Sequence, residues 1–198
     1  MNKYVEGREI GEIWGLQTIG IAKSEEEMQA HLSSLPKGGQ EAIGSKWSAG
    51  DIMYRDLNGD GKISKGASTL DDHGDLKVIG NSTPRYFFGI DLNADWKGFD
   101  VRLFFQGVMK RDYWGKDNFC GYLFGARGDK DMWHARGLVE HQDYFRAQAI
   151  GIDGHELPAN LDAYYPRPVF KEGAKNQETQ SRYLQDASYI RLKNFQLG

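Results

Sequence analysis

The residues of this sequence best suited to chemistry are oxygen donors crowded between positions 56 and 64, which read Asp-Leu-Asn-Gly-Asp-Gly-Lys-Ile-Ser. A calcium loop of the EF-hand type needs Asp or Asn at its first, third and fifth positions, Gly at the sixth and a backbone carbonyl at the seventh. Asp56, Asn58, Asp60, Gly61 and the carbonyl of Lys62 supply these groups. The spacing therefore predicts a Ca²⁺ site.

The closing ligand of this loop does not stand where an EF-hand places it, because the twelfth position is Ala67 rather than Glu. Asp71, Asp72 and Asp75 follow, and we expect Asp75 to return to the loop and complete the site. The alternative is a solvated turn without metal, since Asp, Asn and Gly favour turns by themselves. The three aligned acceptors and the glycine favour calcium.

A second set of candidates lies in the stretch from 107 to 180, where aromatic residues alternate with Asp, Asn and Arg. An apolar ring platform beside groups that hydrogen-bond hydroxyls suits a sugar ligand. We expect Trp114, Tyr122 and Trp133 to contact such a ligand. The alternative role for each ring is to pack long loops against one another or against a partner.

Catalysis has weaker candidates. Two pairs of nearby acids, Asp71 with Asp72 and Asp129 with Asp131, have the residue type of a hydrolase site. Adjacent acids in a polar loop lack the desolvated setting that raises the pKa of one carboxyl and makes it a general acid. No Ser/His/Asp or Cys/His motif and no Gly-rich phosphate loop is recognisable. We expect no enzymatic activity.

The element that organises the chain is a predicted β-hairpin, with two alternating runs separated by Lys97-Gly98. One face of the first run holds Tyr86, Phe88, Ile90, Leu92, Ala94 and Trp96, and one face of the second holds Phe99, Val101, Leu103 and Phe105. Each run is about ten residues long, which is the length of a tilted strand that crosses a bilayer. Tyr86, Trp96, Phe99 and Phe105 would then lie at the headgroup levels. A half-exposed sheet of a soluble domain shows the same pattern.

Composition excludes several classes of protein. The 198 residues include 25 basic and 28 acidic side chains, a net charge of −3, so nucleic acid is not an expected partner. The single cysteine, Cys120, has no partner for an internal disulfide. No apolar run is long enough for a transmembrane helix, and no export signal follows Met1.

Elsewhere the sequence predicts little regular structure. A helix is expected over 24–35, where Ser24 and Glu27 form a capping box. A second short helix is expected from Met132 to Phe145. Residues 185–198 resume strand character, with Ile190 and Leu192 on one face and Tyr189, Phe195 and Leu197 on the other.

Several blocks of residues resemble one known family. They are Gly11-Glu12-Ile13-Trp14-Gly15, Gly50 to Arg55 before the acidic loop, Val78-Ile79-Gly80-Asn81 with Pro84, Tyr86 to Asn93, Trp96 to Asp100, Phe104 to Gly107, and Asp186 to Asn194. In this order they resemble the SusC/RagA family of TonB-dependent outer-membrane receptors. Family members are several times longer, so the resemblance implies that the chain is a late part of the barrel without the plug domain or the segment that contacts TonB.

The resemblance implies an all-β fold of antiparallel transmembrane strands, forming an incomplete outer-membrane barrel with long external loops and one or two short helices. It also implies import of glycans or other large nutrients, with a SusD-like surface lipoprotein and the TonB system as partners. The expected location is the cell outer membrane, where lipid covers the apolar side of the hairpin.

The expected organisation follows from a periplasmic turn at Lys97-Gly98. Residues 1–84 form an external region that holds the helix and the acidic loop of 56–75, residues 85–107 form the transmembrane hairpin, residues 108–184 form a long external loop, and residues 185–198 begin another barrel strand. An open barrel leaves backbone groups unpaired in lipid, so the chain alone is not expected to be a stable membrane protein. The alternative, a soluble calcium-stabilised β-module that binds carbohydrate, predicts that this chain buries the apolar side of the hairpin.

Overall fold

The computed structural model describes residues 6–115, 139–152, 154–169 and 173–198. The strands are β1 (Glu12–Leu16), β2 (Thr18–Ile21), β3 (Ile52–Tyr54), β4 (Leu76–Asn81), β5 (Tyr86–Trp96), β6 (Phe99–Met109), β7 (Asp112–Trp114), β8 (Ile150–Ile152), β9 (His155–Leu157), β10 (Leu184–Asp186) and β11 (Tyr189–Leu197). The helices are α1 (Glu25–Ser33) and the 3₁₀ turns η2 (Val139–Gln142), η3 (Gly173–Asn176) and η4 (Ser181–Tyr183). The expected fold class is confirmed, because the regular structure of the described residues is mostly β-strand, paired antiparallel in sheets that do not close. None of the described helices has the length and apolar character needed to cross a membrane.

The chain divides into two compact units, each assembled from separate segments of the sequence. Of the described residues, the first unit contains 14–79, 115, 139–152, 154–169 and 173–183, and the second contains 6–13, 80–114 and 184–198.

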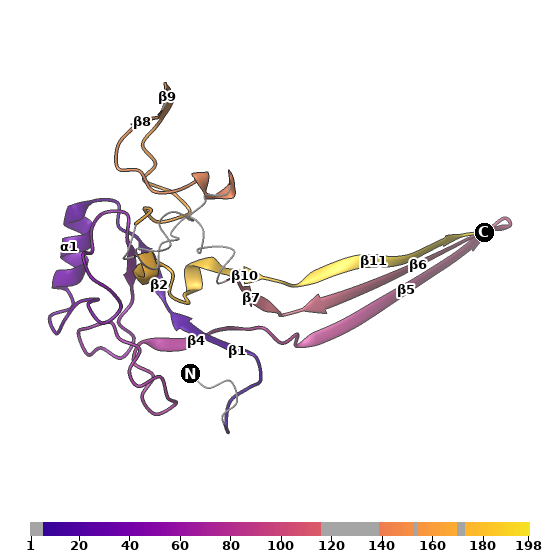
Figure 1. Cartoon of the computed structure of the whole chain (residues 1–198). Helices are drawn as coiled ribbons and strands as arrows, with labels where there is room; N and C mark the ends of the chain where they lie inside the picture. Colours follow the sequence, from indigo (N-terminus) through magenta and orange to yellow (C-terminus); the bar gives the residue numbers. More distant parts are fainter. Residues whose placement is uncertain (1–5, 116–138, 153, 170–172) are drawn as a thin grey trace, which may run out of the picture. The chain divides into compact units, whose positions relative to one another are not determined.

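The second unit is built on a three-stranded antiparallel sheet in the order β11-β6-β5 (Figure 1). Strands β5 and β6 pair without interruption from Tyr86 opposite Met109 to Trp96 opposite Phe99. The two-residue turn between them has φ of 49° at Lys97 and 90° at Gly98, as a type I′ hairpin turn requires. The predicted hairpin is therefore present with the predicted turn.

The register corrects one expectation about the hairpin. Phe105 was expected at the end of the apolar face, but it lies opposite Ile90, two rows inside the end formed by Tyr86 and Met109. The strand β6 continues through Val108 to Met109, so the apolar face is longer than the sequence pattern indicates.

The strand β11 corrects a second expectation. It pairs with β6, and its register shifts between Leu192 and Asn194, which is a β-bulge. Because the extra residue inverts the alternation beyond it, Phe195 and Leu197 join Leu192 on the same face instead of lying on the opposite one. Phe195 lies opposite Leu103, which belongs to the apolar face of the hairpin.

Two glycines let the strands of this sheet lie beneath aromatic rings. A Cβ atom at Gly107 would lie 2.1 Å from Cζ of Phe88, the residue directly opposite. A Cβ atom at Gly89 would lie 3.1 Å from Cε2 of Phe104 on the other face. Each ring covers the glycine of the neighbouring strand, an arrangement that compensates for the missing side chain.

The first unit contains α1, and its N-terminus follows the predicted cap. The Ser24 side-chain oxygen accepts a hydrogen bond from the Glu27 N–H at 3.2 Å. The Glu27 carboxylate accepts one from the N–H of Lys23 at 2.6 Å, one residue before the N–H that a capping box uses. The helix buries Met28 and ends at Ser33.

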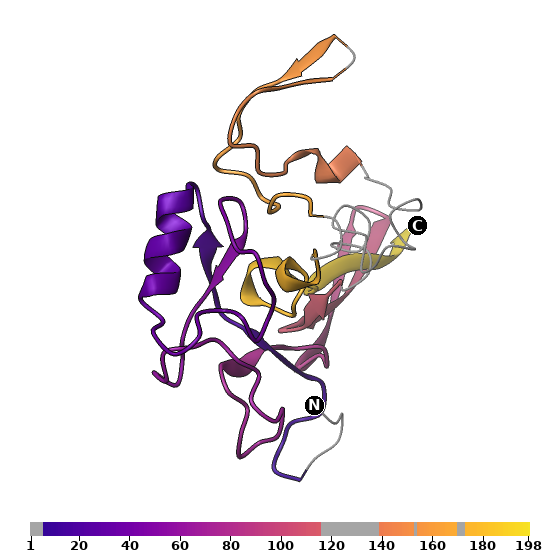
Figure 2. The same cartoon turned by 60° about the vertical axis from the view of Figure 1, so that its left-hand side comes forward.

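The core of the first unit combines apolar side chains with buried amides. Its fully buried apolar residues include Leu16, Met28, Ile52, Tyr54, Ile63 and Tyr183. Gln40 is also buried; it donates to the carbonyl of Ile52 at 3.1 Å and accepts from the N–H of Tyr54 at 2.6 Å. These bonds satisfy the edge of β3 that does not pair with β2. A small hairpin of β8 and β9 also belongs to this unit (Figure 2).

The helix expected from Met132 to Phe145 is wrong over the residues that the structure describes. A single 3₁₀ turn, Val139–Gln142, is present, and residues 132–138 lie outside the described part. Beyond it Tyr144 and Arg146 form isolated bridges with Tyr165 and Asn160. The backbone of 144–146 is therefore paired with a distant segment, and that pairing excludes a helix.

Candidate functional sites: a two-faced sheet, an acidic loop and a buried ion cluster

The sheet of the second unit has one face on which every residue with a register partner is apolar or glycine. This apolar face consists of Tyr86, Phe88, Ile90, Leu92, Ala94, Trp96, Phe99, Val101, Leu103, Phe105, Gly107, Met109, Ile190, Leu192, Phe195 and Leu197. At mid-strand Leu92 is 51% exposed and Phe195 is 59% exposed. A contiguous apolar surface of this kind marks a protein or membrane contact.

The opposite face of the same sheet is polar. It holds Asp91, Asn93, Asp95, Asp100, Arg102, Gln106, Arg191, Asn194 and Gln196, with a few apolar residues toward one end. Arg102 donates two hydrogen bonds to the Asp91 carboxylate, one of them at 3.1 Å, across the strands β6 and β5. The two faces thus separate apolar from polar side chains in the half of the sheet nearest the Lys97-Gly98 turn. Toward the other end the second face also carries Phe87, Phe104, Val108 and Tyr189.

The acidic loop belongs to the first unit and folds its side-chain oxygens onto its own backbone. Asp56 accepts from the N–H groups of Gly59 at 2.6 Å and Gly61 at 2.9 Å. Asn58 accepts from Asp60 N–H at 2.9 Å, and Asp60 accepts from Lys62 N–H at 3.1 Å. These bonds hold the alternate oxygens in one tight turn, and a carboxylate oxygen keeps further lone pairs free for another partner.

Asp75 returns to the acidic loop, as expected from the sequence. Its carboxylate accepts from Leu57 N–H at 2.8 Å and from Ser64 N–H at 2.7 Å, so it fastens both ends of the loop. Its side chain is fully buried. In the described residues, however, no three His, Cys, Asp or Glu side chains gather in a group able to hold a metal ion. The structure thus brings Asp75 to the loop through backbone bonds rather than into a ligand shell with Asp56 and Asp60.

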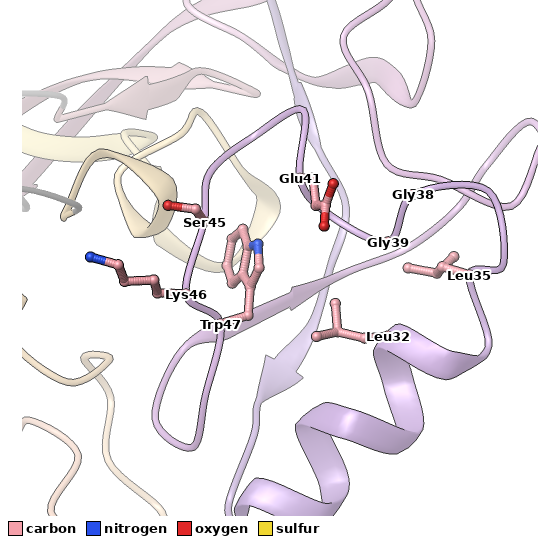
Figure 3. Close-up of a pocket in the computed structure, with 8 residues that line it drawn as sticks. All are labelled: Leu32, Leu35, Gly38, Gly39, Glu41, Ser45, Lys46 and Trp47. Atoms are coloured by element: carbon pink, nitrogen blue, oxygen red, sulfur yellow. The ribbon is translucent and has the colours of Figure 1, made fainter.

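The first unit also contains a cavity of about 570 Å³ (Figure 3). It is lined by Leu32, Leu35, Gly38, Gly39, Glu41, Ser45, Lys46 and Trp47. The segment that ends at Gly39 is fixed by the acidic loop, because Lys37 N–H donates to the Gly61 carbonyl at 2.8 Å and Ile63 N–H donates to the Gly39 carbonyl at 2.7 Å. The conformation of the loop therefore sets one wall of the cavity.

A buried ion cluster centred on Asp51 ties the loop before β3 to η3. Asp51 is fully buried and accepts from Lys175 Nζ at 2.7 Å, from Asn176 Nδ2 at 2.9 Å and from Arg167 at 3.0 Å. Lys175 is also buried, and its ammonium lies 4.8 Å from the Trp47 ring centroid. The cluster orders the segment that carries Trp47 into the cavity.

The ionisation of Asp51 follows from these contacts. Burial alone would raise its pKa, but the hydrogen bonds from Arg167, Lys175 and Asn176 together outweigh burial and hold the pKa below its ordinary value. The carboxylate is therefore charged at neutral pH and forms ion pairs with Lys175 and Arg167.

The structure describes some of the remaining candidate residues and not others. Trp114 ends β7, which pairs with β10, and its indole N–H is buried without a hydrogen-bond partner. Tyr122, Trp133, Asp129 and Asp131 lie outside the described residues. Asp72 accepts from the N–H of Ala67 at 3.0 Å and shapes an exposed turn.

Sequence reasoning missed the Asp51 cluster and the cavity. The partners of Asp51 are 116 to 125 positions away along the chain, and no motif links them. Trp47 offered a signal, because a large ring in a loop of small residues needs a partner to pack against. That signal did not identify Lys175.

A sheet with one exposed apolar face and one polar face, built from strands of this length, has the pattern of the wall of a β-barrel membrane protein. Comparison with curated proteins agrees with this class. TonB-dependent receptor P3 of Formosa agariphila is 27% identical over 196 residues, which cover 98% of this chain. TonB-dependent receptor P26 of the same organism is 24% identical over 205 residues and 99% of the chain. TonB-dependent receptor P39, also of that organism, is 26% identical over 149 residues and 75% of the chain.

These similarities confirm the resemblance to TonB-dependent receptors that the sequence blocks indicate. The chain spans 15%, 16% and 12% of the lengths of these three receptors, so it corresponds to one segment of each. No protein-family model matches the chain.

Proposed function

We propose that this chain is a segment of an outer-membrane receptor of the SusC/RagA type, which imports glycans or another large nutrient. In this proposal the sheet β11-β6-β5 is part of the barrel wall, with its apolar face in lipid and its polar face toward the lumen. A SusD-like surface lipoprotein would assist capture of the nutrient, and the TonB system would supply energy through parts of the receptor outside this sequence. The chain itself performs no chemical reaction.

One observation carries the proposal: the apolar face extends across all three strands of the sheet. On β11 a bulge places Phe195 and Leu197 on the same face as Leu192. A soluble protein would bury such a face, whereas Leu92, Leu192 and Phe195 are each at least half exposed. The sequence similarity to TonB-dependent receptors supports the same reading. The alternative of a soluble carbohydrate-binding module predicts a buried hairpin face, and the exposure of Leu92 and Phe195 disfavours it.

We further propose that the acidic loop binds Ca²⁺. Asp56, Asn58, Asp60 and the Lys62 carbonyl would contribute oxygens. The Asp75 carboxylate lies beside them and accepts hydrogen bonds from Leu57 and Ser64, one at each end of the loop. Support comes from the alternating oxygens of one turn and from the lone pairs that their N–H bonds leave free. The bound ion would supply rigidity to the loop, and so to the wall of the cavity beside Gly39.

We propose nutrient contacts for the aromatic positions Trp114, Tyr122 and Trp133. Trp114 has a buried indole N–H without an acceptor, and a buried donor left unsatisfied costs roughly 1–3 kcal/mol. A ligand hydroxyl would remove that cost.

The test is uptake by cells of the host organism. A strain lacking the receptor gene, and the same strain complemented with the gene, are compared for accumulation of a panel of fluorescently labelled oligosaccharides. We expect the deletion to abolish uptake of one glycan class and complementation to restore it. An affinity-tagged receptor purified from the outer membrane should retain a surface lipoprotein.

Two results would contradict the proposal. Recovery of the receptor in the soluble fraction would remove the membrane assignment. Unchanged uptake of every glycan, together with lost uptake of a labelled peptide, would replace glycans by another nutrient and leave the receptor class standing.

A further inference from the structure

Two lysines at opposite ends of the apolar face adopt a backbone conformation that side chains with a Cβ rarely adopt. Among the described residues of the second unit, the positive-φ residues other than glycine are Lys97, with φ of 49°, and Lys110, with φ of 51°. Asn, Asp and Gly are the residues that normally occupy this left-handed region. Lysine at both positions therefore indicates a requirement for its side chain.

Each lysine lies against the terminal aromatic ring of the apolar face. Lys97 Nζ is 4.9 Å from the Trp96 ring centroid, and Lys110 Nζ is 5.9 Å from the Tyr86 ring centroid. Trp96 is 69% exposed and Tyr86 is 54% exposed, so neither lysine is held in a closed core.

The backbone conformation of Lys110 explains how it reaches this side of the sheet. Met109 lies on the apolar face, so a regular continuation of β6 would turn the next side chain to the polar face. The left-handed turn instead brings Lys110 over Tyr86. Both cations thus lie at the borders of the apolar face.

The distance between the two borders matches a membrane. Tyr86 and Trp96 are ten residues apart on β5, which is about 34 Å along a strand at ~3.4 Å per residue. A strand tilt of 35–45° reduces this to roughly 24–28 Å, close to the ~25 Å height of the lipid-facing band of outer-membrane barrels.

Neighbouring charges do not account for the lysines. Asp95 and Asp100 flank the turn, but they lie opposite each other on the polar face, whereas the ammonium of Lys97 lies by the Trp96 ring of the apolar face. Glu9 is engaged by Arg85. Within the described residues, no carboxylate forms an ion pair with Lys97 or Lys110.

We propose that Lys97 and Lys110 bind phosphate groups of lipid headgroups, one at each surface of the membrane, and so fix the depth of the sheet. This inference rests on the proposed membrane position of the sheet. An ammonium that leans over an interfacial ring and borders an apolar surface is suited to a lipid phosphate. A water-soluble anion would gain nothing from the apolar residues on the remaining side.

The test uses the full-length receptor that carries this chain, inserted in nanodiscs. Retained lipid is measured by native mass spectrometry for phosphatidylglycerol against phosphatidylcholine with the same acyl chains. The variants are Lys97→Asn and Lys110→Asn, because asparagine tolerates the left-handed conformation and removes the charge. We expect each to lower the preference for phosphatidylglycerol by about five-fold, and Lys→Arg at the same positions to keep it.

The matched control is Lys193→Asn, an exposed lysine at the β11 bulge away from both borders, and it should leave the preference unchanged. Variants that insert normally and keep the wild-type preference would overturn the role of the lysines. A wild-type receptor that fails to insert even into phosphatidylcholine would instead overturn the membrane position itself.

Discussion

The Asp51 cluster offers the sharpest test of how the first unit is held together. The perturbation is Asp51→Asn, which removes the carboxylate from Lys175 while keeping the size of the side chain. Lys175 is 1% exposed and would retain the carbonyls of Ser45 and Lys46 at 3.0 and 2.8 Å as acceptors, without a counter-charge. Removing one partner of a buried ion pair costs about 3–5 kcal/mol. At ~1.4 kcal/mol per factor of ten, the lower figure already corresponds to a roughly 100-fold increase in local opening.

The assay is hydrogen exchange of the full-length receptor, read at the amides of Ile52 and Tyr54. Ile52 N–H donates to Asn176 Oδ1 at 3.1 Å, so it reports on the cluster directly. The strands β5 and β6 provide an internal reference that should not change. Because replacing both members of a buried pair is often nearly neutral, Asp51→Asn with Lys175→Met should regain part of the lost protection. Unchanged protection in Asp51→Asn would refute the reasoning.

The pKa of Asp51 also gives this cluster a pH dependence of known sign. Since the pKa is lowered in the folded state, the stabilising contribution is fully present above the ordinary carboxyl pKa and is lost as the pH falls through the lower folded value. Protection of Ile52 should therefore remain constant near neutrality and fall only below roughly pH 4. Loss of protection between pH 7 and 5 would contradict this assignment.

Three further predictions follow from particular side chains. Leu92→Arg, on the apolar face at mid-strand, should reduce the stability of the folded receptor in a bilayer by about 2–4 kcal/mol, whereas Asn93→Arg on the polar face should have little effect. An equal loss of stability in both variants would argue against a lipid contact. Calcium should raise the protease resistance of residues 51–75, and Asp60→Ala should abolish this protection. Identical cleavage with calcium and with chelator would contradict the proposal that the loop binds calcium. Ser24→Ala should lower the stability of α1 by about 0.5–2 kcal/mol, measured by hydrogen exchange of its first-turn amides. An unchanged exchange rate would show that Ser24 does not stabilise the helix as its N-cap.

The hairpin was predictable from the sequence because its determinants are local. The alternation of Tyr86 to Trp96 and the Lys97-Gly98 pair define strand, face and turn within a short stretch. The cap at Ser24 is local in the same sense. The faces of β11 were not predictable, because a bulge adds one residue without a sequence signal and inverts every side chain beyond Leu192.

The candidate site shows the same limit. The turn of Asp56 to Lys62 follows from residues a few positions apart, whereas the partner of Asp51 in η3 depends on the fold of the whole unit. The expected helix before Phe145 failed for a related reason, since pairing of Tyr144 and Arg146 with a distant segment prevails over local preference. Asp75 lies at the loop, where its carboxylate accepts from the N–H groups of Leu57 and Ser64, and its role as a calcium ligand stays a prediction.

The central claim is that lipid covers the apolar face of β5, β6 and β11. The most direct measurement attaches a spin label to single cysteines at positions 90 to 94 of the full-length receptor, with Cys120 replaced by serine, and compares collision with oxygen and with a water-soluble nickel complex. Labels at Ile90, Leu92 and Ala94 should favour oxygen and those at Asp91 and Asn93 should favour nickel, alternating with every residue. Uniform accessibility along the strand, or preference for nickel at Leu92, would contradict the account.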